Sequence, residues 1–101
     1  MRIENRKLEG DVKINDEVTL NGTVGGSIIV SDSGNLVLNG IVCQDLILEK
    51  GSIVELFGTV NGDVRNRGGE IRVKGTIMGS IYKEAGTIII EPEGKIKGHI
   101  Y

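Results

Sequence analysis

The segment Gly58-Thr-Val-Asn-Gly-Asp-Val64 is followed 17 residues later by Gly75-Thr-Ile-Met-Gly-Ser-Ile81, which has the same residue types at most positions. This pattern of Gly, aliphatic, Gly, aliphatic recurs six times along the 101 residues. The other copies are Leu8-Glu-Gly10-Asp-Val12, Gly22-Thr-Val24-Gly-Gly26-Ser-Ile28, Gly40-Ile-Val42-Cys-Gln44-Asp-Leu46 and Gly94-Lys-Ile96-Lys-Gly98-His-Ile100. From Gly22 onward their first glycines are 18, 18, 17 and 19 residues apart. Such a short period is the signature of a repeat architecture.

Each of the first five copies is followed by a second segment in which an aliphatic residue occupies every second position. These segments are Val18-Thr-Leu20, Leu36-Val-Leu38, Val54-Glu-Leu56, Ile71-Arg-Val73 and Ile88-Ile-Ile90. Alternation at period two predicts strands and excludes helix along most of the chain. Three Asn-Gly pairs leave open an antiparallel sheet of hairpins. The same residue type at the same position of every copy favours a solenoid instead, because equivalent side chains stack there.

The sequence therefore predicts an all-β fold, a right-handed parallel β-helix (β-solenoid) of about six coils with 17 to 18 residues per coil. The spacings of 17 and 19 favour the right-handed form, since left-handed hexapeptide coils vary little from about 18 residues. Residues 1–5 are expected as a short N-terminal extension and residues 6–101 as a single domain. Here a column means the residues at one position of successive coils.

Four aliphatic columns are predicted to form the core. They are Leu8, Val24, Val42, Val60, Ile77 and Ile96; Val12, Ile28, Leu46, Val64, Ile81 and Ile100; Val18, Leu36, Val54, Ile71 and Ile88; and Leu20, Leu38, Leu56, Val73 and Ile90. A further inward column is expected to be nearly side-chain-free, because glycine leaves room in a crowded interior or at a corner. It contains Gly10, Gly26, Gln44, Gly62, Gly79 and Gly98.

Composition excludes several classes of protein. The net charge of -2 and the pI near 5.4 give no electrostatic reason to bind nucleic acid. A single cysteine, Cys43, cannot form an internal disulfide, and one histidine is too few for a zinc site of the usual ligands. No apolar run approaches a membrane span or a secretory signal. We expect a cytoplasmic protein without cofactor or metal.

The repeats resemble those of the bactofilins, a family of polymer-forming bacterial cytoskeletal proteins. Gly58-Thr-Val-Asn-Gly-Asp-Val64 and Gly75-Thr-Ile-Met-Gly-Ser-Ile81 carry the resemblance most clearly, and it covers residues 6–101. It implies a compact right-handed β-helix that polymerises end to end into filaments without nucleotide. It also implies partners among cell-envelope or cell-wall-modifying proteins, through which the chain would reach the inner face of the cell membrane. The charged segment Met1 to Lys7 gives no reason to expect direct membrane binding.

The ends of the coil are the expected self-association sites on physical grounds as well. A rod of six coils is only about 25 to 30 Å long, so its ends form much of its surface. Solenoids normally close their ends with polar capping repeats, and the sequence predicts no such cap here. A second copy is the simplest cover, in a head-to-tail filament or a like-to-like dimer. The predicted contact residues are Leu8, Val12, Ile14, Val18 and Leu20 at the N-terminal end, and Ile81, Ile88, Ile90, Ile96, Ile100 and Tyr101 at the C-terminal end.

Other candidate chemistry has plainer explanations. Asp11, Asp45 and Asp63 follow the glycine column and could hold a cation, but bonding to corner backbone groups explains them more simply. Cys43 and His99 lack an activating third group, so no catalytic residues are expected. The basic residues Arg65, Arg67, Arg72 and Lys74 are predicted to be a solvated face.

Two further functions stay open at this stage. A β-helical binding module for a polysaccharide or a cell-wall enzyme is the main alternative, because solenoid faces suit extended ligands. Phe57, Tyr82 and Tyr101 are the only aromatic residues besides His99, and we expect their spacing not to form a stacking platform. An enzyme is the third and weakest interpretation.

Overall fold

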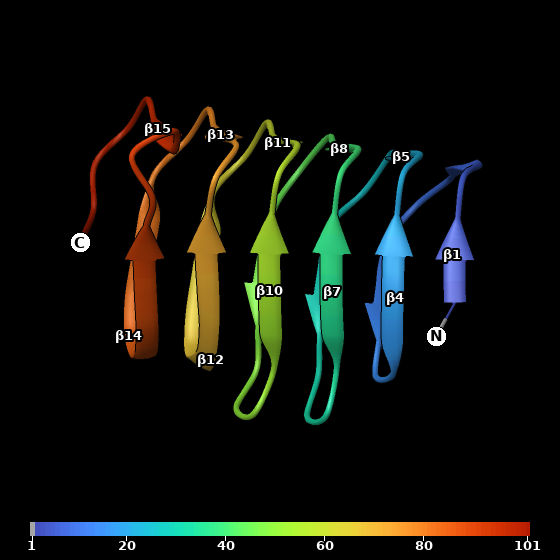
Figure 1. The fold of residues 1–101 in the computed structure, drawn as a ribbon, viewed down its shortest axis with the longest axis horizontal. Helices are drawn as coiled ribbons and strands as arrows, with labels where there is room; N and C mark the ends of the chain where they lie inside the picture. The colour runs from blue at the N-terminus through green and yellow to red at the C-terminus, as the bar shows by residue number, and fades with distance from the viewer. Residues whose placement is uncertain (1) are drawn as a thin grey trace.

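The computed structural model describes residues 2–101, and these residues form strands and connections without a helix. They wind into a right-handed β-solenoid of about five turns, with successive turns side by side along the long axis (Figure 1). The turns form three faces, and each of the earlier turns contributes one strand to each face. Every strand pair is parallel, so the hairpin alternative is wrong and the parallel β-helix is confirmed.

The three faces consist of short strands stacked in register. The first face holds β1 (Arg2–Glu4), β4 (Glu17–Leu20), β7 (Asn35–Leu38) and β10 (Ile53–Leu56). The second holds β2 (Lys7–Leu8), β5 (Thr23–Val24), β8 (Ile41–Val42), β11 (Thr59–Val60), β13 (Thr76–Ile77) and β15 (Lys95–Ile96). The third holds β3 (Val12–Ile14), β6 (Ile28–Val30) and β9 (Leu46–Leu48). The longer strands β12 (Val64–Val73) and β14 (Ile81–Ile90) continue the third face around a corner into the first.

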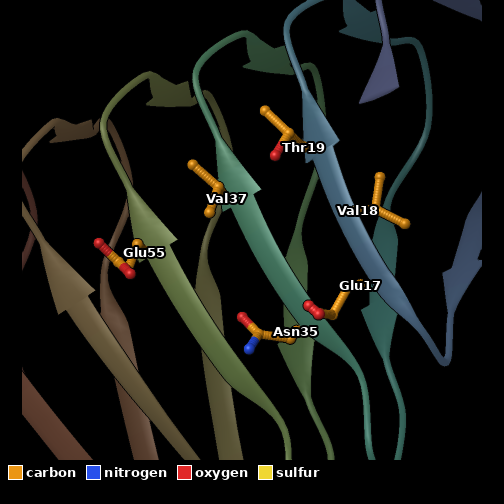
Figure 2. A pocket seen from close by; sticks show the side chains of 6 residues that line it. All are labelled: Glu17, Val18, Thr19, Asn35, Val37 and Glu55. Carbon is orange, nitrogen blue, oxygen red and sulfur yellow. The ribbon is translucent and has the colours of Figure 1, made fainter. Parts of the chain in front are cut away.

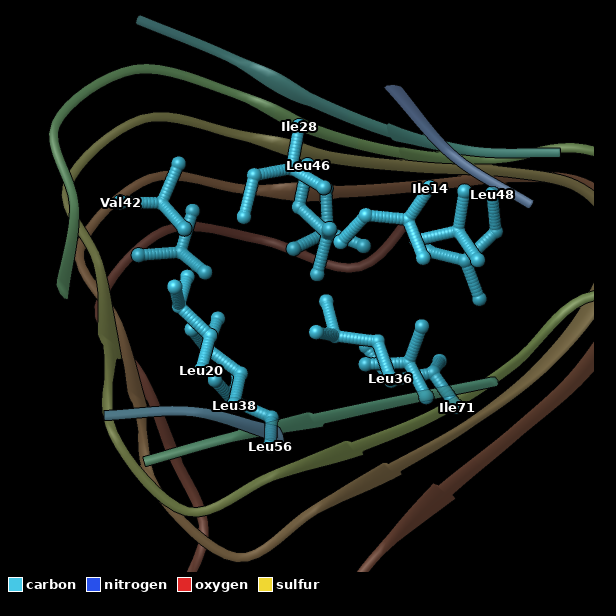
Figure 3. Packing of buried hydrophobic residues seen from close by; sticks show 14 of the residues in the cluster. Ile14, Leu20, Ile28, Leu36, Leu38, Val42, Leu46, Leu48, Leu56 and Ile71 are labelled. Atoms are coloured by element: carbon cyan, nitrogen blue, oxygen red, sulfur yellow. The ribbon is translucent and has the colours of Figure 1, made fainter. Parts of the chain in front are cut away.

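The predicted aliphatic columns form the interior. The register aligns Val24 with Val42 and Val42 with Val60, and all three side chains are fully buried. Figure 3 shows Leu38 and Leu56 facing Leu46 across the narrow interior. The hydrophobic core cluster consists of Val, Ile and Leu side chains, which explains how a chain with 3% aromatic residues fills its core.

A fifth core column was not predicted. Ile14, Val30 and Leu48 align in register, and each is at most 1% exposed. The next position of this column holds Asn66, which is fully buried. Its side-chain amide donates to the carbonyls of Gly69 and Thr87 at 3.0 Å each, and its side-chain oxygen accepts from backbone N–H groups at the corner. Asn66 thus supplies hydrogen-bond partners to the backbone groups at the tight corner inside β12.

The glycine column does not line the interior as predicted. Gln44 shares this column, and its side chain is exposed. A Cβ added at Gly62 would lie 2.6 Å from the carbonyl oxygen of Gln44 on the preceding turn. Glycine is required because backbones of neighbouring turns approach closely along the axis.

The N-terminal residues differ from the expected extension. Arg2–Glu4 forms β1, which pairs with β4 and adds a strand to the first face. The coil makes about five turns, compared with the six or so expected from the copies of the motif. The edge strands at the two ends of this stack are the positions at which the sequence predicts self-association.

Candidate functional site

The C-terminal end presents aliphatic side chains that no later strand covers within residues 2–101. Ile90 is 39% exposed, Ile100 is 53% exposed and Tyr101 is 64% exposed. Ile88 and Ile96 are half-buried. Strands β14 and β15 and the C-terminus, which carry these five residues of the predicted site, lie at one end of the coil (Figure 1).

Position along the axis causes this exposure. Ile90 belongs to the column of Leu38, Leu56 and Val73, and those three side chains are fully buried. Ile81, also predicted as a contact residue, is buried because Ile100 pairs with it as the next layer. Ile81 therefore belongs to the core of the single chain, beneath the surface that a partner could touch.

The N-terminal end differs from the predicted open aliphatic layer. Ile14, Val18 and Leu20 are at most 4% exposed, while Leu8 and Val12 are half-buried. A small cavity opens among these five residues and the two charged residues of β1, Arg2 and Glu4. The predicted residues therefore share one site, but most of their surface is already covered.

Strand β1 is a polar cap, which the sequence analysis did not expect. Its register places Arg2 beside Val18 and Glu4 beside Leu20, in columns that are aliphatic at every later turn. Inward charges on an edge strand oppose the pairing of a further apolar layer. The N-terminal end of the coil is therefore chemically unlike the C-terminal end.

Ion pairs hold the charges of this cap. The Arg6 guanidinium donates to the Glu4 carboxylate, with Nε at 2.8 Å from Oε1, and Glu4 has a side-chain exposure of only 17%. This hydrogen bond from Arg6 lowers the pKa of Glu4 below its ordinary value of 4.5. Arg2 lies 3.3 Å from Asp16 at the corner before β4. The cap charges are thus paired, so β1 can lie on the coil without an isolated inward charge.

The column of Asp11, Asp45 and Asp63 is a hydrogen-bond ladder. The side-chain oxygen of Asp45 accepts the backbone N–H of Asp63 on the next turn at 2.8 Å, and Asp63 accepts that of Ser80 at 2.8 Å. Ser27 makes the same kind of bond to Asp45 at 3.1 Å. Backbone bonding, the plainer of the two explanations, is confirmed for these side chains. Within residues 2–101, no three His, Cys, Asp or Glu side chains are placed to share a metal ion.

Two of the three aromatic residues form a column near the C-terminal end, which the sequence analysis did not predict. The rings of Tyr82 and Tyr101 are stacked with centroids 5.1 Å apart and an interplanar angle of 15°. The Arg65 guanidinium lies 4.7 Å from the centroid of Tyr82, on the other side of that ring. His99 contacts Tyr101 edge-on at 6.1 Å. The separation of 19 positions between the two tyrosines equals the local spacing of the repeat, and this signal could have predicted the stack.

The remaining candidates are dispersed over the outer surface. Arg65 and Arg67 both approach Glu84, and Arg72 lies 3.7 Å from Glu91. Lys74 lies 5.0 Å from the ring centroid of Phe57. Three of the four predicted basic residues are therefore paired with carboxylates, and their side chains remain 42% to 49% exposed. Cys43 is exposed and lies on a different turn from His99.

Figure 2 shows a pocket on the outer surface of β4, β7 and β10, with a volume of about 180 Å³. Glu17 and Glu55 bring carboxylates to it, with Thr19, Asn35 and Val37 between them. Side chains of this outer surface are solvated, and the pocket lacks a buried polar group aimed into it. The pocket therefore offers no distinct chemistry.

Comparisons with protein-family models, with curated proteins and with solved structures find no match to this chain. Residues 2–101 also contain no helix that is long and apolar enough to cross a membrane. The two ends of the coil, with their contrasting chemistry, are the strongest candidate functional surfaces.

Proposed function

We propose that this chain is a structural subunit that assembles end to end, without nucleotide, into filaments of a cytoplasmic scaffold. The observation that supports it is the exposure of Ile90, Ile100 and Tyr101 at 39%, 53% and 64% in an edge layer of the core. Exposed apolar surface at a strand edge favours association with another chain. The resemblance of the repeats to bactofilins points to the same function.

Self-association suits this end better than an unrelated partner does. The exposed layer repeats the side-chain types and spacing of the layers beneath it, so it matches the geometry of another coil of this protein. The β14 edge also carries backbone groups that can pair with a strand. A second copy therefore offers both apolar burial and strand pairing, as neighbouring turns do within one chain.

Proteins of the cell envelope or cell-wall-modifying enzymes remain proposed partners of the assembled form. A filament repeats each outer face of the coil at the spacing of the subunit, which gives a partner many equivalent sites. We propose no nucleic-acid partner, since the net charge is -2, and no direct membrane contact. The protein would then act as a scaffold and would not be an enzyme.

A binding module for a polysaccharide is favoured by one observation, the stack of Tyr82 on Tyr101. These rings lie face to face along the coil axis with centroids 5.1 Å apart. Arg65 lies over the remaining face of Tyr82. A lateral sugar would therefore meet ring edges, whereas stacking on sugars and bases uses ring faces. The end-to-end scaffold is the better supported of the two functions.

Sedimentation velocity of three proteins tests the scaffold proposal. The wild type is expected to sediment as assemblies, and Ile100→Asp as a folded monomer, because assembly would bury the new charge. Ile53→Asp is the matched control, since Ile53 is 42% exposed on the outer face of β10, and it should sediment as the wild type does. Equal sedimentation of the wild type and Ile100→Asp would contradict the proposal.

A further inference from the structure

The two ends of the coil carry different side chains in the same columns. At the C-terminal end the first face terminates in Ile88 and Ile90, and at the N-terminal end it terminates in Arg2 and Glu4. Ile88 continues the column of Val18, which lies beside Arg2. A second copy added in register at the N-terminal end would therefore place Ile88 against Arg2 and Ile90 against Glu4.

Such a contact is unfavourable for a definite physical reason. It would remove Arg2 and Glu4, with their ion-pair partners Asp16 and Arg6, from water against aliphatic side chains, and the desolvation of such charges is costly even when they are paired. The rest of the end does not share this mismatch, because Leu8 continues the column of Ile96 and Val12 continues that of Ile100. The obstacle is confined to two side chains of one short strand.

We propose that β1 is a charged cap that blocks addition of another copy at the N-terminal end of the coil. This inference rests on the proposed end-to-end assembly, and it names the strand that would regulate that assembly. Among the described residues 2–101, β1 contains three residues and pairs with β4 alone. Displacement of so short a strand uncovers Val18 and Leu20, which are at most 4% exposed in the capped state. A capped subunit can therefore contact another copy through its C-terminal end. Addition of a copy at the N-terminal end requires displacement of β1.

The test replaces the two charges with the residues of their own columns. In Arg2→Val/Glu4→Leu, β1 has the side-chain types found at the later turns, so the fold is expected to persist. The matched control is Lys7→Val/Glu9→Leu. This control also replaces a basic residue with Val and a glutamate with Leu, but at an exposed ion pair whose side chains are 67% and 85% exposed. Sedimentation velocity over a range of concentrations measures association, and circular dichroism verifies the β-fold.

The cap variant is expected to associate at a concentration about tenfold or more below that of the wild type. The control should associate as the wild type does. Arg2→Gln/Glu4→Gln removes the charges without adding apolar surface and is expected to fall between the two, which keeps the test decisive if the first variant aggregates unfolded. Association of both cap variants at the wild-type concentration would overturn the proposal.

The outcome separates the cap from the proposed function. If Ile100→Asp abolishes wild-type assembly and the cap variants change nothing, the scaffold stands and the cap is wrong. If the wild type and Ile100→Asp are both monomers and the cap variants associate, the cap is supported and association of capped subunits through their C-terminal ends is wrong. If all of these proteins are monomers, both proposals are overturned.

Discussion

Arg2 lies directly beside Val18 in the parallel register of β1 and β4, at a column position that is aliphatic on every later turn. A charged side chain thus occupies the first layer of a column whose other members form the core. The opposite end of the same column is the half-buried Ile88. The two ends of this solenoid are therefore not interchangeable as surfaces for assembly.

Acidification should weaken the cap through Glu4. The hydrogen bond from Arg6 lowers the pKa of Glu4 below 4.5, and the charge of Arg2 acts in the same direction. A lowered folded-state pKa stabilises the folded form above the ordinary pKa, and this contribution is lost as the pH falls through the lowered value. Glu4→Gln should therefore destabilise pairing of β1 at neutral pH, and its difference from the wild type should vanish below the lowered pKa.

Hydrogen exchange of the Asn21 amide measures this effect, because that amide donates to the Glu4 carbonyl at 2.7 Å. The ratio of its protection in the wild type and in Glu4→Gln should be greatest near neutral pH. A ratio that stays constant down to the lowest pH at which the coil remains folded would contradict the assigned role of Glu4.

The buried corner amide should resist replacement by an apolar residue. Asn66→Leu suits an aliphatic column, but it removes the partners of the Gly68 and Gly69 N–H groups and of the Gly69 and Thr87 carbonyls. We expect a loss of about 2 to 4 kcal/mol in the free energy of unfolding. Urea unfolding measures it, with the exposed Asn61→Leu as a nearly neutral control. A variant as stable as the wild type would show that the corner does not need Asn66.

Replacement of Asp63 in the hydrogen-bond ladder by serine should preserve most of the stability of the fold, whereas replacement by alanine should lower it. Asp63→Ala removes the acceptor of the Ser80 N–H, and we expect a loss of about 1 to 2 kcal/mol. Asp63→Ser should recover most of this stability, because Ser80 already uses its hydroxyl to accept the His99 N–H at 3.0 Å in the same column. Thermal unfolding of both variants provides the comparison. Equal stability of the two variants would argue against the ladder.

Truncation of a buried core side chain should lower the free energy of unfolding far more than truncation of its outward-facing neighbour. Leu46 is fully buried, and Leu46→Ala is expected to destabilise the coil by about 2 to 5 kcal/mol. Its neighbour Ile47 is turned to the outer surface and half-buried, so Ile47→Ala should cost less than about 1.5 kcal/mol. Urea unfolding of the two variants measures the difference, and equal losses would contradict the observed register.

The sequence predicted the architecture well because its two periods agree. Alternation at period two identifies inward positions such as Leu36 and Leu38, and the longer repeat places equivalent positions on adjacent turns. The column of Ile14, Val30 and Leu48 was missed because polar Asn66 interrupts it, where β12 also shifts register. Local environment, in the form of hydrogen bonds at a corner, decides that position.

The chemistry of the ends was harder to predict than the fold. Arg2-Ile-Glu4 alternates at the period of a strand, but its charged residues point inward and Ile3 is 56% exposed. The polarity of β1 is thus the reverse of that of every other strand on this face. A pattern that assigns apolar residues to the interior cannot detect such a strand, and it is the register with β4 that reveals it.

Negative-stain electron microscopy of the untagged wild-type protein, without nucleotide, is the most direct test of end-to-end assembly. One subunit, which is the whole solenoid of a single chain, measures 31 Å along its longest axis and 24 and 23 Å across it. The account predicts rods that keep the width of a single subunit and are longer than one chain, with short rods of paired subunits where β1 caps the N-terminal end and filaments where the cap is released. Uniform single-coil particles, or clusters that widen across the axis, would contradict it.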